Sequence, residues 1–206
     1  MICSYDCGMN DEVGHQKRAL RAELRERRQT MTATERETAA TALTHNLQTL
    51  ASAPGISYIA AYLSTPNEPN TRDFLAWAAA RGIRVLLPIS RLDGLLDWAP
   101  FNPSDEVDDE GRDGLGMPTP TSELLGPIAI NDVDLIIVPA ASVDRTGMRM
   151  GWGRGYFDKT LGSMERCPPV YAVIFDHELV DTVPSEVHDQ KVNGVVTPSS
   201  VVTFAR

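Results

Sequence analysis

Five short runs of mostly apolar residues constrain the fold of this chain more than any other feature of its sequence. Their apolar residues are largely consecutive, whereas a strand with one face in water alternates apolar and polar residues. The runs lie at residues 56–63, 83–89, 135–138, 170–175 and 192–196. Consecutive apolar residues are typical of strands that are buried on both faces. The sequence therefore predicts an α/β protein with a mainly parallel sheet flanked by helices.

A pair of helices is predicted before the first of these runs. Residues 16–29 are strong helix formers without Gly or Pro, and their many arginines leave only a narrow apolar stripe. The second helix is expected to begin at Thr34, because Thr34 and Glu37 have the spacing of a capping box. Pro54 and the glycine after it would end this helix.

The length of the chain is that of one domain. We expect residues 1–14 to form a mobile leader and residues 15–206 to form a single α/β catalytic domain with the helical pair at its start. A third helix is predicted over residues 71–80, between the first two apolar runs. Asp93 and Gly94 have the composition of a tight hairpin turn.

Charge and composition restrict the partners and the location of the protein. The formal net charge is −9 and the isoelectric point is about 4.9, so an acidic surface would repel nucleic acid and anionic membranes. No apolar run approaches the roughly 20 residues that span a bilayer. The three cysteines are an odd number and indicate unpaired thiols. We expect a cytoplasmic monomer that binds neither nucleic acid nor membranes.

A glycine-rich segment that follows the run at 135–138 is the strongest candidate for a site, because ligands of α/β sheets collect where strands end. Arg149 could hold phosphate oxygens with its planar fork, and Asp158 offers the hard oxygen ligand that Mg²⁺ prefers. A helix that starts near Tyr156 would add its positive end. The glycines let the backbone approach an anion closely, at Gly147, Gly151, Gly153 and Gly155.

Two common nucleotide motifs are excluded for this segment. A Walker A loop needs Gly-Lys-Ser or Gly-Lys-Thr after its glycines, and none is present. The spacing of Gly151, Gly153 and Gly155 also differs from the dinucleotide fingerprint, and no strand is predicted to run directly into it. The residues thus predict a binding site for a phosphate and a metal ion of another kind.

The segment from 134 to 158 resembles the signature of the 5-formyltetrahydrofolate cyclo-ligase (methenyltetrahydrofolate synthetase) family. It reads Asp-Leu-Ile-Ile-Val-Pro, then Asp144 and Gly147, then Arg-Met-Gly-Trp-Gly-Arg-Gly-Tyr-Phe-Asp. Shorter matches are Lys-Arg-Ala-Leu-Arg at 17–21 and Glu-Pro-Asn-Thr at 68–71. The closing match contains Pro184, His188-Asp189 and Val-Val-Thr-Pro at 195–198. The resemblance covers about residues 15 to 200, in order.

The resemblance implies a fold related to sugar-phosphate isomerases and CoA transferases, with ATP, Mg²⁺ and a reduced folate as its ligands. It implies the cyclisation of 5-formyltetrahydrofolate to 5,10-methenyltetrahydrofolate, with release of ADP and phosphate, through a phosphorylated formyl intermediate. Two alternatives stay open at this point. One is an isomerase or transferase on the same scaffold, which would need no ATP. The other is a regulatory protein that binds nucleotide without turnover.

The resemblance also implies a role for each matching residue. The catalytic residues would be Lys17, Arg149 and Tyr156. Glu68 and Tyr156 would bind the folate, and Asp158 and Asp189 would ligate Mg²⁺. The ATP-binding residues would be Lys17, Arg21, Arg149, Gly151, Trp152, Gly153, Arg154, Gly155, Tyr156 and Phe157.

Five positions depart from the pattern of the family. Ala140 and Val143 stand where the family usually has Gly and Phe, and Thr119 stands where it usually has Glu. Arg154 replaces a usual Gly, and His177 lies near a usual Gln. These departures bear on the folate side of the site more than on the phosphate side.

Overall fold

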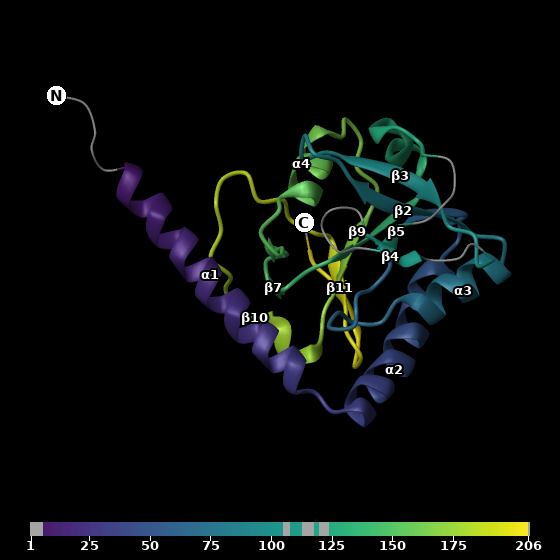
Figure 1. Ribbon diagram of the computed structural model, residues 1–206, viewed down its shortest axis with the longest axis horizontal. Coiled ribbons are helices and arrows are strands. Elements are labelled where there is room, and N and C mark those ends of the chain that lie inside the picture. The colour runs from purple at the N-terminus through teal and green to yellow at the C-terminus, as the bar shows by residue number, and fades with distance from the viewer. Residues whose placement is uncertain (1–5, 105–107, 113–117, 120–123, 206) are drawn as a thin grey trace.

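A seven-stranded sheet forms the centre of the computed structural model, which describes residues 6–104, 108–112, 118–119 and 124–205 (Figure 1). Its strands are β1 (Tyr58–Ala60), β2 (Arg84–Ser90), β3 (Leu96–Pro100), β6 (Leu135–Pro139), β9 (Val170–Val173), β11 (Gly194–Val196) and β12 (Val201–Thr203). Their order across the sheet is β12-β11-β9-β6-β1-β2-β3. The inner pairs are parallel, and only the edge strands β3 and β12 run antiparallel to their neighbours. The predicted mainly parallel sheet is confirmed.

Each predicted apolar run contributes one inner strand, and β1, β9 and β11 are shorter than their runs. The run at 56–63 forms ladder pairs only over Tyr58–Ala60, whereas Tyr62 and Leu63 are buried in the core beyond the end of the strand. Burial of these side chains therefore extends further than strand pairing. The hairpin predicted at Asp93 and Gly94 joins β2 to β3, and the positive φ of 82° at Gly94 suits its tight turn.

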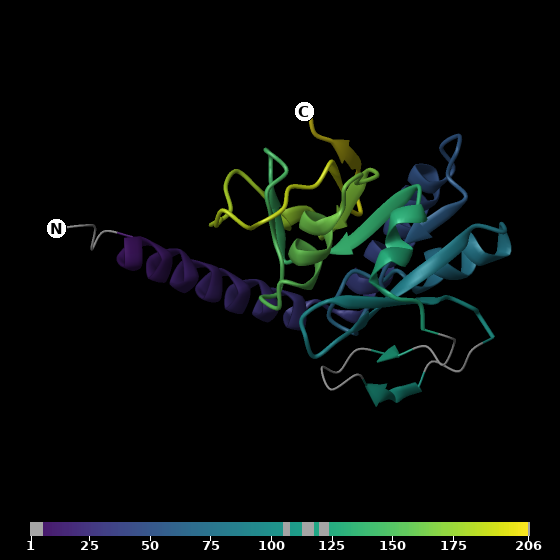
Figure 2. The ribbon, with the colours of Figure 1, turned by 90° about the horizontal axis from the view of Figure 1, so that it is seen from above.

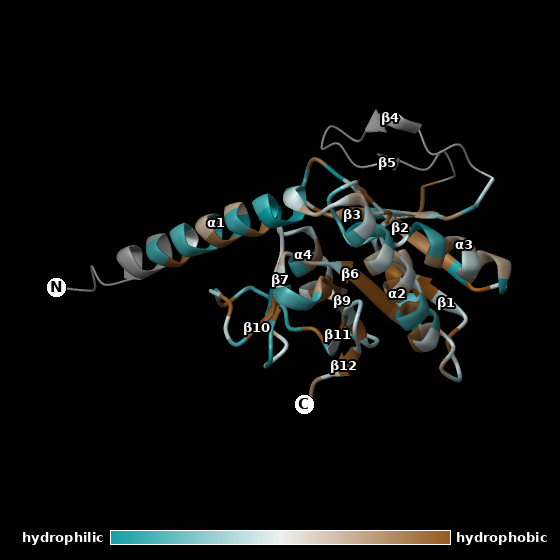
Figure 3. Ribbon diagram, turned by 90° about the horizontal axis from the view of Figure 1, so that it is seen from below, coloured by the Kyte–Doolittle hydropathy of each residue, from teal (hydrophilic) through white to brown (hydrophobic). Residues whose placement is uncertain are grey.

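Helices cover both faces of the sheet, which explains why its strands are apolar throughout. On β6, Leu135 and Ile137 pack in one core cluster, and Ile136 and Val138 pack in another on the opposite face. The first cluster includes residues of α2 (Ala33–Ala51) and α3 (Arg72–Ala80). The second includes residues of α4 (Tyr156–Ser163) and the 3-10 helix η1 (Pro127–Asp132). Figure 3 shows the central strand β6 as strongly hydrophobic between these layers.

The first helix, α1 (Asp6–Thr30), packs on a smaller sheet and extends away from the body at its N-terminal end (Figure 2). This second sheet has the order β10-β7-β8, with β7 (Ser142–Asp144), β8 (Arg149–Met150) and β10 (Leu179–Val180). Leu24 of α1 packs there against Ala141, Met150 and Val183. The helix begins ten residues before the expected start at residue 16, so residues 6–14 are helical. The division into a mobile leader and a domain stays a prediction.

A buried ion pair attaches the C-terminal part of α1 to the body. The Arg28 guanidinium donates to both carboxylate oxygens of Glu178, at 2.7 and 2.8 Å, and to the Ala140 carbonyl oxygen at 2.8 Å. Glu178 ends the 3-10 helix η2 (Asp176–Glu178) and also accepts a hydrogen bond from the Phe175 amide. Both charged side chains are fully buried. Such a pair needs all of these partners to offset its loss of hydration.

A third sheet lies apart from the two larger ones. The strands β4 (Asp108–Arg112) and β5 (Pro118–Thr119) form a two-stranded sheet, which contains Thr119. Residues 1–5 of the predicted leader lie outside the described residues. Within the described part of the chain, none of the helices has the length and apolar character needed to cross a membrane.

The N-cap of helix α2 lies two residues before the predicted one. Its N-cap is Thr32, whose side chain accepts from the Glu35 amide at 3.2 Å while Glu35 accepts from the Thr32 amide at 2.8 Å. The prediction of a capping box at Thr34 and Glu37 was therefore wrong. Both pairs have the same spacing, and only the extended backbone of Thr32, with ψ at 160°, identifies the cap.

We expect Thr32→Ala to lower the free energy of unfolding by about 1 kcal/mol, because it leaves the first amides of α2 without their side-chain acceptor. Thr34→Ala is the matched control, since it changes the same residue type within the helix and should cost nothing comparable. Urea unfolding of both variants measures the difference. Equal losses in the two variants would contradict this assignment of the cap.

Candidate functional site

The two loops that carry the predicted site leave the sheet at the same edge. β1 and β6 are parallel neighbours, with Ile59 opposite Leu135. Glu68 lies in the loop after β1, and the glycine-rich segment follows β6. Because carboxyl ends of parallel strands meet at one edge, the loops come together, as expected for an open α/β sheet.

The glycine-rich segment has two parts with different tasks. Gly147, with a φ of 84°, turns the hairpin between β7 and β8, and a Cβ on it would lie 2.6 Å from the Val192 carbonyl oxygen. The positive φ therefore serves this turn, and the expected approach of an anion to Gly147 stays a prediction. Gly153 and Gly155 also have positive φ angles, of 101° and 70°. Gly155 is the N-cap of α4, so the predicted helix start at Tyr156 is confirmed.

A cavity of about 210 Å³, here called the central cavity, lies between the Glu68 loop and the glycine-rich segment. Pro88, Leu96 and Pro139 supply apolar parts of its wall. The predicted site residues that line it are Glu68, Arg149, Gly151, Trp152, Arg154, Gly155, Tyr156, Phe157 and Asp158. Residues predicted for the folate and for ATP thus face one space.

A second cavity of about 180 Å³, here called the α1 cavity, lies between α1 and the same segment. The predicted site residues that line it are Lys17, Arg21, Gly151, Gly153, Gly155, Asp158 and Asp189. Gly151, Gly155 and Asp158 line both cavities. Every residue to which the resemblance gives a role therefore lines the central cavity, the α1 cavity or both.

Arg149 is buried and held in a fixed orientation. Its Nη2 donates to Asp158 Oδ1 at 2.7 Å, and its Nη1 donates to the Pro139 carbonyl oxygen at 3.5 Å. Asp158 Oδ1 also accepts from the Gln190 amide at 3.1 Å. Among the described residues, the buried Nε of Arg149 has no hydrogen-bond partner. An unsatisfied buried donor is unusual and suits a group that awaits an anionic ligand.

Lys17 is buried and lines the α1 cavity. Its Nζ lies 2.7 Å from Glu186 Oε2 and 2.6 Å from Asp189 Oδ2. Asp189 Oδ2 accepts in addition from the Glu186 amide at 2.7 Å. Sequence reasoning missed Glu186, because its partner on α1 is 169 residues away and nothing local marks it.

The acidic residues of the α1 cavity have the chemistry of a Mg²⁺ site. The predicted ligands Asp158 and Asp189 both face this cavity with carboxylate oxygens, which Mg²⁺ prefers. Glu186, His188 and Asp189 also offer ligand atoms within 4.8 Å of one another. The pairs with Arg149 and Lys17 use Oδ1 of Asp158 and Oδ2 of Asp189. The close carboxylates of Glu186 and Asp189 are therefore donors of the kind that a magnesium ion takes.

Arg21 links α1 directly to the glycine-rich segment. Its Nε donates to the Gly151 carbonyl oxygen at 2.8 Å. Burial lowers the pKa of the Arg21 guanidinium, and the nearby carboxylates of Asp189 and Glu186 oppose this shift. A Cβ on Gly153 would lie 3.4 Å from the guanidinium, so the glycine permits this close approach. The cation is thus placed against the backbone that was predicted to hold phosphate.

Glu68 and Tyr156 lie on the walls of the central cavity. Glu68 is half-buried and its Oε2 accepts from the Thr65 amide at 2.9 Å and the Thr65 hydroxyl at 3.0 Å. Burial raises the pKa of the Glu68 carboxyl, against the opposing effect of these hydrogen bonds. The Tyr156 hydroxyl donates to the Arg91 carbonyl oxygen at 3.2 Å, which ties α4 to the β2–β3 hairpin.

Trp152 lies on the side of the site that faces Glu68. Its ring packs against two cations of α1, with the guanidinium carbon of Arg28 at 4.7 Å and that of Arg25 at 5.4 Å from the ring centre. It lines the central cavity together with Glu68 and Arg154. Its predicted role in ATP binding stays a prediction.

Three of the departures from the family pattern have structural partners. The Ala140 carbonyl oxygen accepts from Arg28, and Val143 is buried in the core cluster that includes α4. His177 stacks on Phe175, with ring centres 6.2 Å apart. These positions therefore contribute to packing around the site rather than to the walls of the central cavity.

Comparison with known proteins agrees with this geometry. The model of the 5-formyltetrahydrofolate cyclo-ligase family matches residues 13–198. The 5-formyltetrahydrofolate cyclo-ligase of Mycolicibacterium smegmatis is 35% identical over 153 residues, which cover 72% of this chain and 77% of that protein. The Escherichia coli K12 protein of the same name is 30% identical over 148 residues, covering 69% and 79%.

A solved structure shows the same fold. The 5,10-methenyltetrahydrofolate synthetase of Aquifex aeolicus superposes with a TM-score of 0.75 at 22% sequence identity. The superposition covers 92% of this chain and 93% of that one. The fold is therefore shared over almost the whole length of both chains.

Proposed function

This chain belongs to the 5-formyltetrahydrofolate cyclo-ligase family. We propose that its two adjoining cavities bind the two substrates of the reaction, ATP on the side of α1 and the folate in the central cavity. The family reaction is an ATP-dependent ligation of one-carbon metabolism, and this enzyme converts 5-formyltetrahydrofolate to 5,10-methenyltetrahydrofolate. One observation carries the division: Gly151, Gly155 and Asp158 line both cavities. Ligands on the two sides of this wall would lie next to each other.

ATP would bind with its phosphates at the glycine-rich segment. Arg149 and the amides from Gly151 to Gly155 would hold the β- and γ-phosphates, since positive φ angles and the start of α4 favour an anion there. Lys17 and Arg21 would approach the phosphates from α1. Asp158 and Asp189 would hold Mg²⁺, which when bound neutralises charge on the phosphoryl oxygens.

The folate would bind in the central cavity with its formyl-bearing ring near Glu68. The apolar walls and few polar groups of this cavity are typical of sites for ring systems. Glu68 presents an acceptor at one side, and Tyr156 packs at the boundary with the phosphates. The half-buried Glu68 is held in place by Thr65, so its carboxylate is oriented before the substrate arrives.

The chemistry follows from the poor leaving ability of the formyl oxygen. Attack by N10 on the formyl carbon would have to expel hydroxide. Transfer of the γ-phosphoryl group from ATP to the formyl oxygen releases ADP and creates a better leaving group. N10 then forms its bond to the formyl carbon and gives up its proton to the departing phosphate, as the bond from that carbon to the phosphorylated oxygen breaks. Arg149 and the amides would stabilise the charge on the transferred group by their fixed positions.

We propose further that the enzyme acts as a monomer in the cytoplasm, with residues 15–206 as one catalytic domain. A single chain supplies the walls of both cavities. Light scattering at working concentrations tests the monomer directly.

An absorbance assay tests the whole proposal. The methenyl product has a conjugated long-wavelength band that 5-formyltetrahydrofolate lacks. We expect this band to rise only when enzyme, ATP and Mg²⁺ are all present, and to stop rising when a chelator removes the metal. A rise without Mg²⁺ would contradict the metal site. Binding of ATP without any rise would favour a regulatory protein instead.

We expect Glu68→Ala to weaken binding of 5-formyltetrahydrofolate by about 10- to 100-fold, the usual effect of losing a hydrogen bond to a charged group. Its affinity for ATP should stay unchanged, because Glu68 lines the central cavity and not the α1 cavity. Calorimetric titration with each ligand separately measures both. A fall in ATP affinity with folate binding intact would reverse the assignment of the two cavities.

A further inference from the structure

A third cavity opens beside the central cavity, on the side away from the glycines. This lateral cavity has a volume of about 210 Å³ and is lined by Arg25, Arg28, Thr65, Asn67, Glu68 and Trp152. Thr65, Glu68 and Trp152 also line the central cavity. The two spaces therefore adjoin along these three residues.

Arg25 is the available cation of the lateral cavity. Its exposed guanidinium lies over the Trp152 ring at 5.4 Å, which restrains it without using its hydrogen-bond donors. Within the described part of the chain no acidic group pairs with it. Arg28, in contrast, is buried and donates to Glu178 and to the Ala140 carbonyl oxygen. A carboxylate that enters this cavity would thus find Arg25 free to bind it.

We propose that Arg25, supported by Trp152, binds the carboxylates of the glutamate part of the folate substrate. This inference rests on the proposed position of the formyl-bearing ring at Glu68. A reduced folate carries an aminobenzoyl ring and then a glutamate beyond N10. With ATP on the far side of the central cavity, this arm leaves past Glu68 and Trp152. The aminobenzoyl ring lies against the indole, and Arg25 offers its planar fork to the carboxylates beyond.

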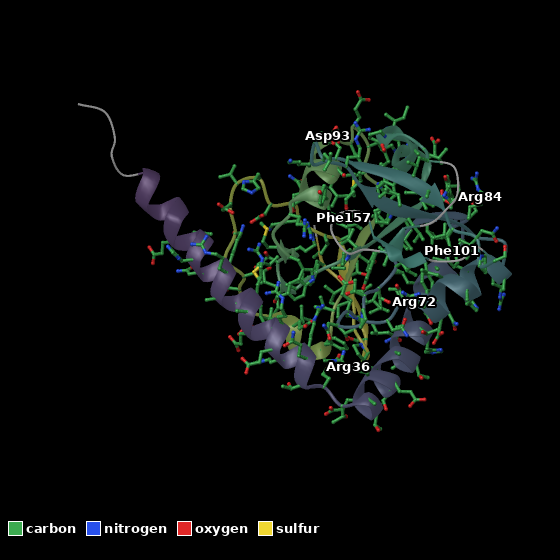
Figure 4. The ribbon with its side chains drawn as sticks, in the orientation of Figure 1. Arg36, Arg72, Arg84, Asp93, Phe101 and Phe157 are labelled. Atoms are coloured by element: carbon green, nitrogen blue, oxygen red, sulfur yellow. The ribbon has the colours of Figure 1, made fainter. Side chains whose placement is uncertain are left out.

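A larger cavity of about 470 Å³ also begins at Thr65 and Glu68, and it is the competing exit for the arm. Its charged residues are Arg36, Arg72, Glu37, Glu68 and Asp73, so acids outnumber arginines. Arg36 lies near the start of α2 and Arg72 near the start of α3 (Figure 4). The Arg36 guanidinium already donates to three backbone carbonyl oxygens. In the lateral cavity the unengaged Arg25 faces a single acid, Glu68, so an entering anion meets less repulsion there.

Arg25→Ala tests the proposal through the substrate arm. We expect KM for 5-formyltetrahydrofolate to rise about 3- to 10-fold with kcat unchanged, because the contact is remote from the reacting atoms. With 5-formyltetrahydropteroate, which lacks the glutamate, Arg25→Ala and wild type should have the same KM. Arg27→Ala is the matched control: this exposed arginine of the same helix pairs with Glu23 and should leave both values unchanged.

Three outcomes would overturn the proposal. KM for the folate could stay unchanged in Arg25→Ala, or it could rise equally for the pteroate. A glutamate-dependent rise in Arg72→Ala instead would assign the arm to the larger cavity. Failure of the proposed function is a separate result, since wild type would then turn over neither substrate. Calorimetric binding of the folate and the pteroate, which needs no turnover, would still compare Arg25→Ala with wild type.

Discussion

Arg149→Ala is expected to reduce kcat/KM by a factor of about 10²–10³, the usual effect of removing a fixed partner of transition-state charge. Arg149 is buried with its Nη2 on Asp158 and its Nε unsatisfied among the described residues. Its position is therefore set before ATP arrives. The absorbance assay at saturating and at low ATP measures kcat and kcat/KM separately.

Arg149→Lys is the informative companion of this variant. Lysine keeps the charge but loses the fork that reaches Asp158 and the Pro139 carbonyl oxygen together. We expect it to recover a part of the lost activity and to unfold at a temperature close to that of wild type. Near wild-type activity of Arg149→Ala would remove Arg149 from the mechanism, whatever the lysine variant does.

Glu178→Ala is expected to lower the free energy of unfolding by about 3–5 kcal/mol, because it leaves the buried Arg28 guanidinium without its counter-charge. Glu178 accepts from Arg28 through both oxygens and from the Phe175 amide, so three hydrogen bonds are lost together. Chemical unfolding followed by circular dichroism measures the loss.

The double variant Arg28→Met with Glu178→Leu provides the control. Because it removes both charges and keeps apolar volume, it should cost clearly less than the sum of the two single variants. Additive losses would show that the pair is not coupled. A cost below about 1 kcal/mol in Glu178→Ala would be typical of a solvated ion pair and would contradict its burial.

The sheet and the main segment of the site could be predicted because both depend on local sequence. Consecutive apolar residues predict strands with two buried faces, and Leu135 to Val138 pack in alternate core clusters on those faces. Glu68 and Arg149 follow the neighbouring parallel strands β1 and β6. Loops that follow such strands leave the sheet at the same edge, so the two residues are expected to lie close together. The cap of α2 could not be chosen in this way, since two pairs have identical spacing.

Contacts between distant segments could not be predicted from the sequence. Glu186 forms an ion pair with Lys17, from which it is separated by 169 positions in the sequence, and Glu178 pairs with Arg28 at a separation of 150. Each is an ordinary charged residue in its local sequence, and only the packing of α1 on the small sheet creates the pair. Gly147 is the converse case. It belongs to the sequence motif, but its positive φ turns a hairpin, and it lines neither cavity.

The wall shared by the central cavity and the α1 cavity has a thermodynamic consequence. Gly151, Gly155 and Asp158 line both spaces, so a ligand that holds them in place from one side would prepare them for the ligand on the other. By linkage, ATP must then raise the affinity for folate by the same factor by which folate raises the affinity for ATP. An inhibitor that fills one cavity would accordingly bind more tightly when the natural ligand occupies the other.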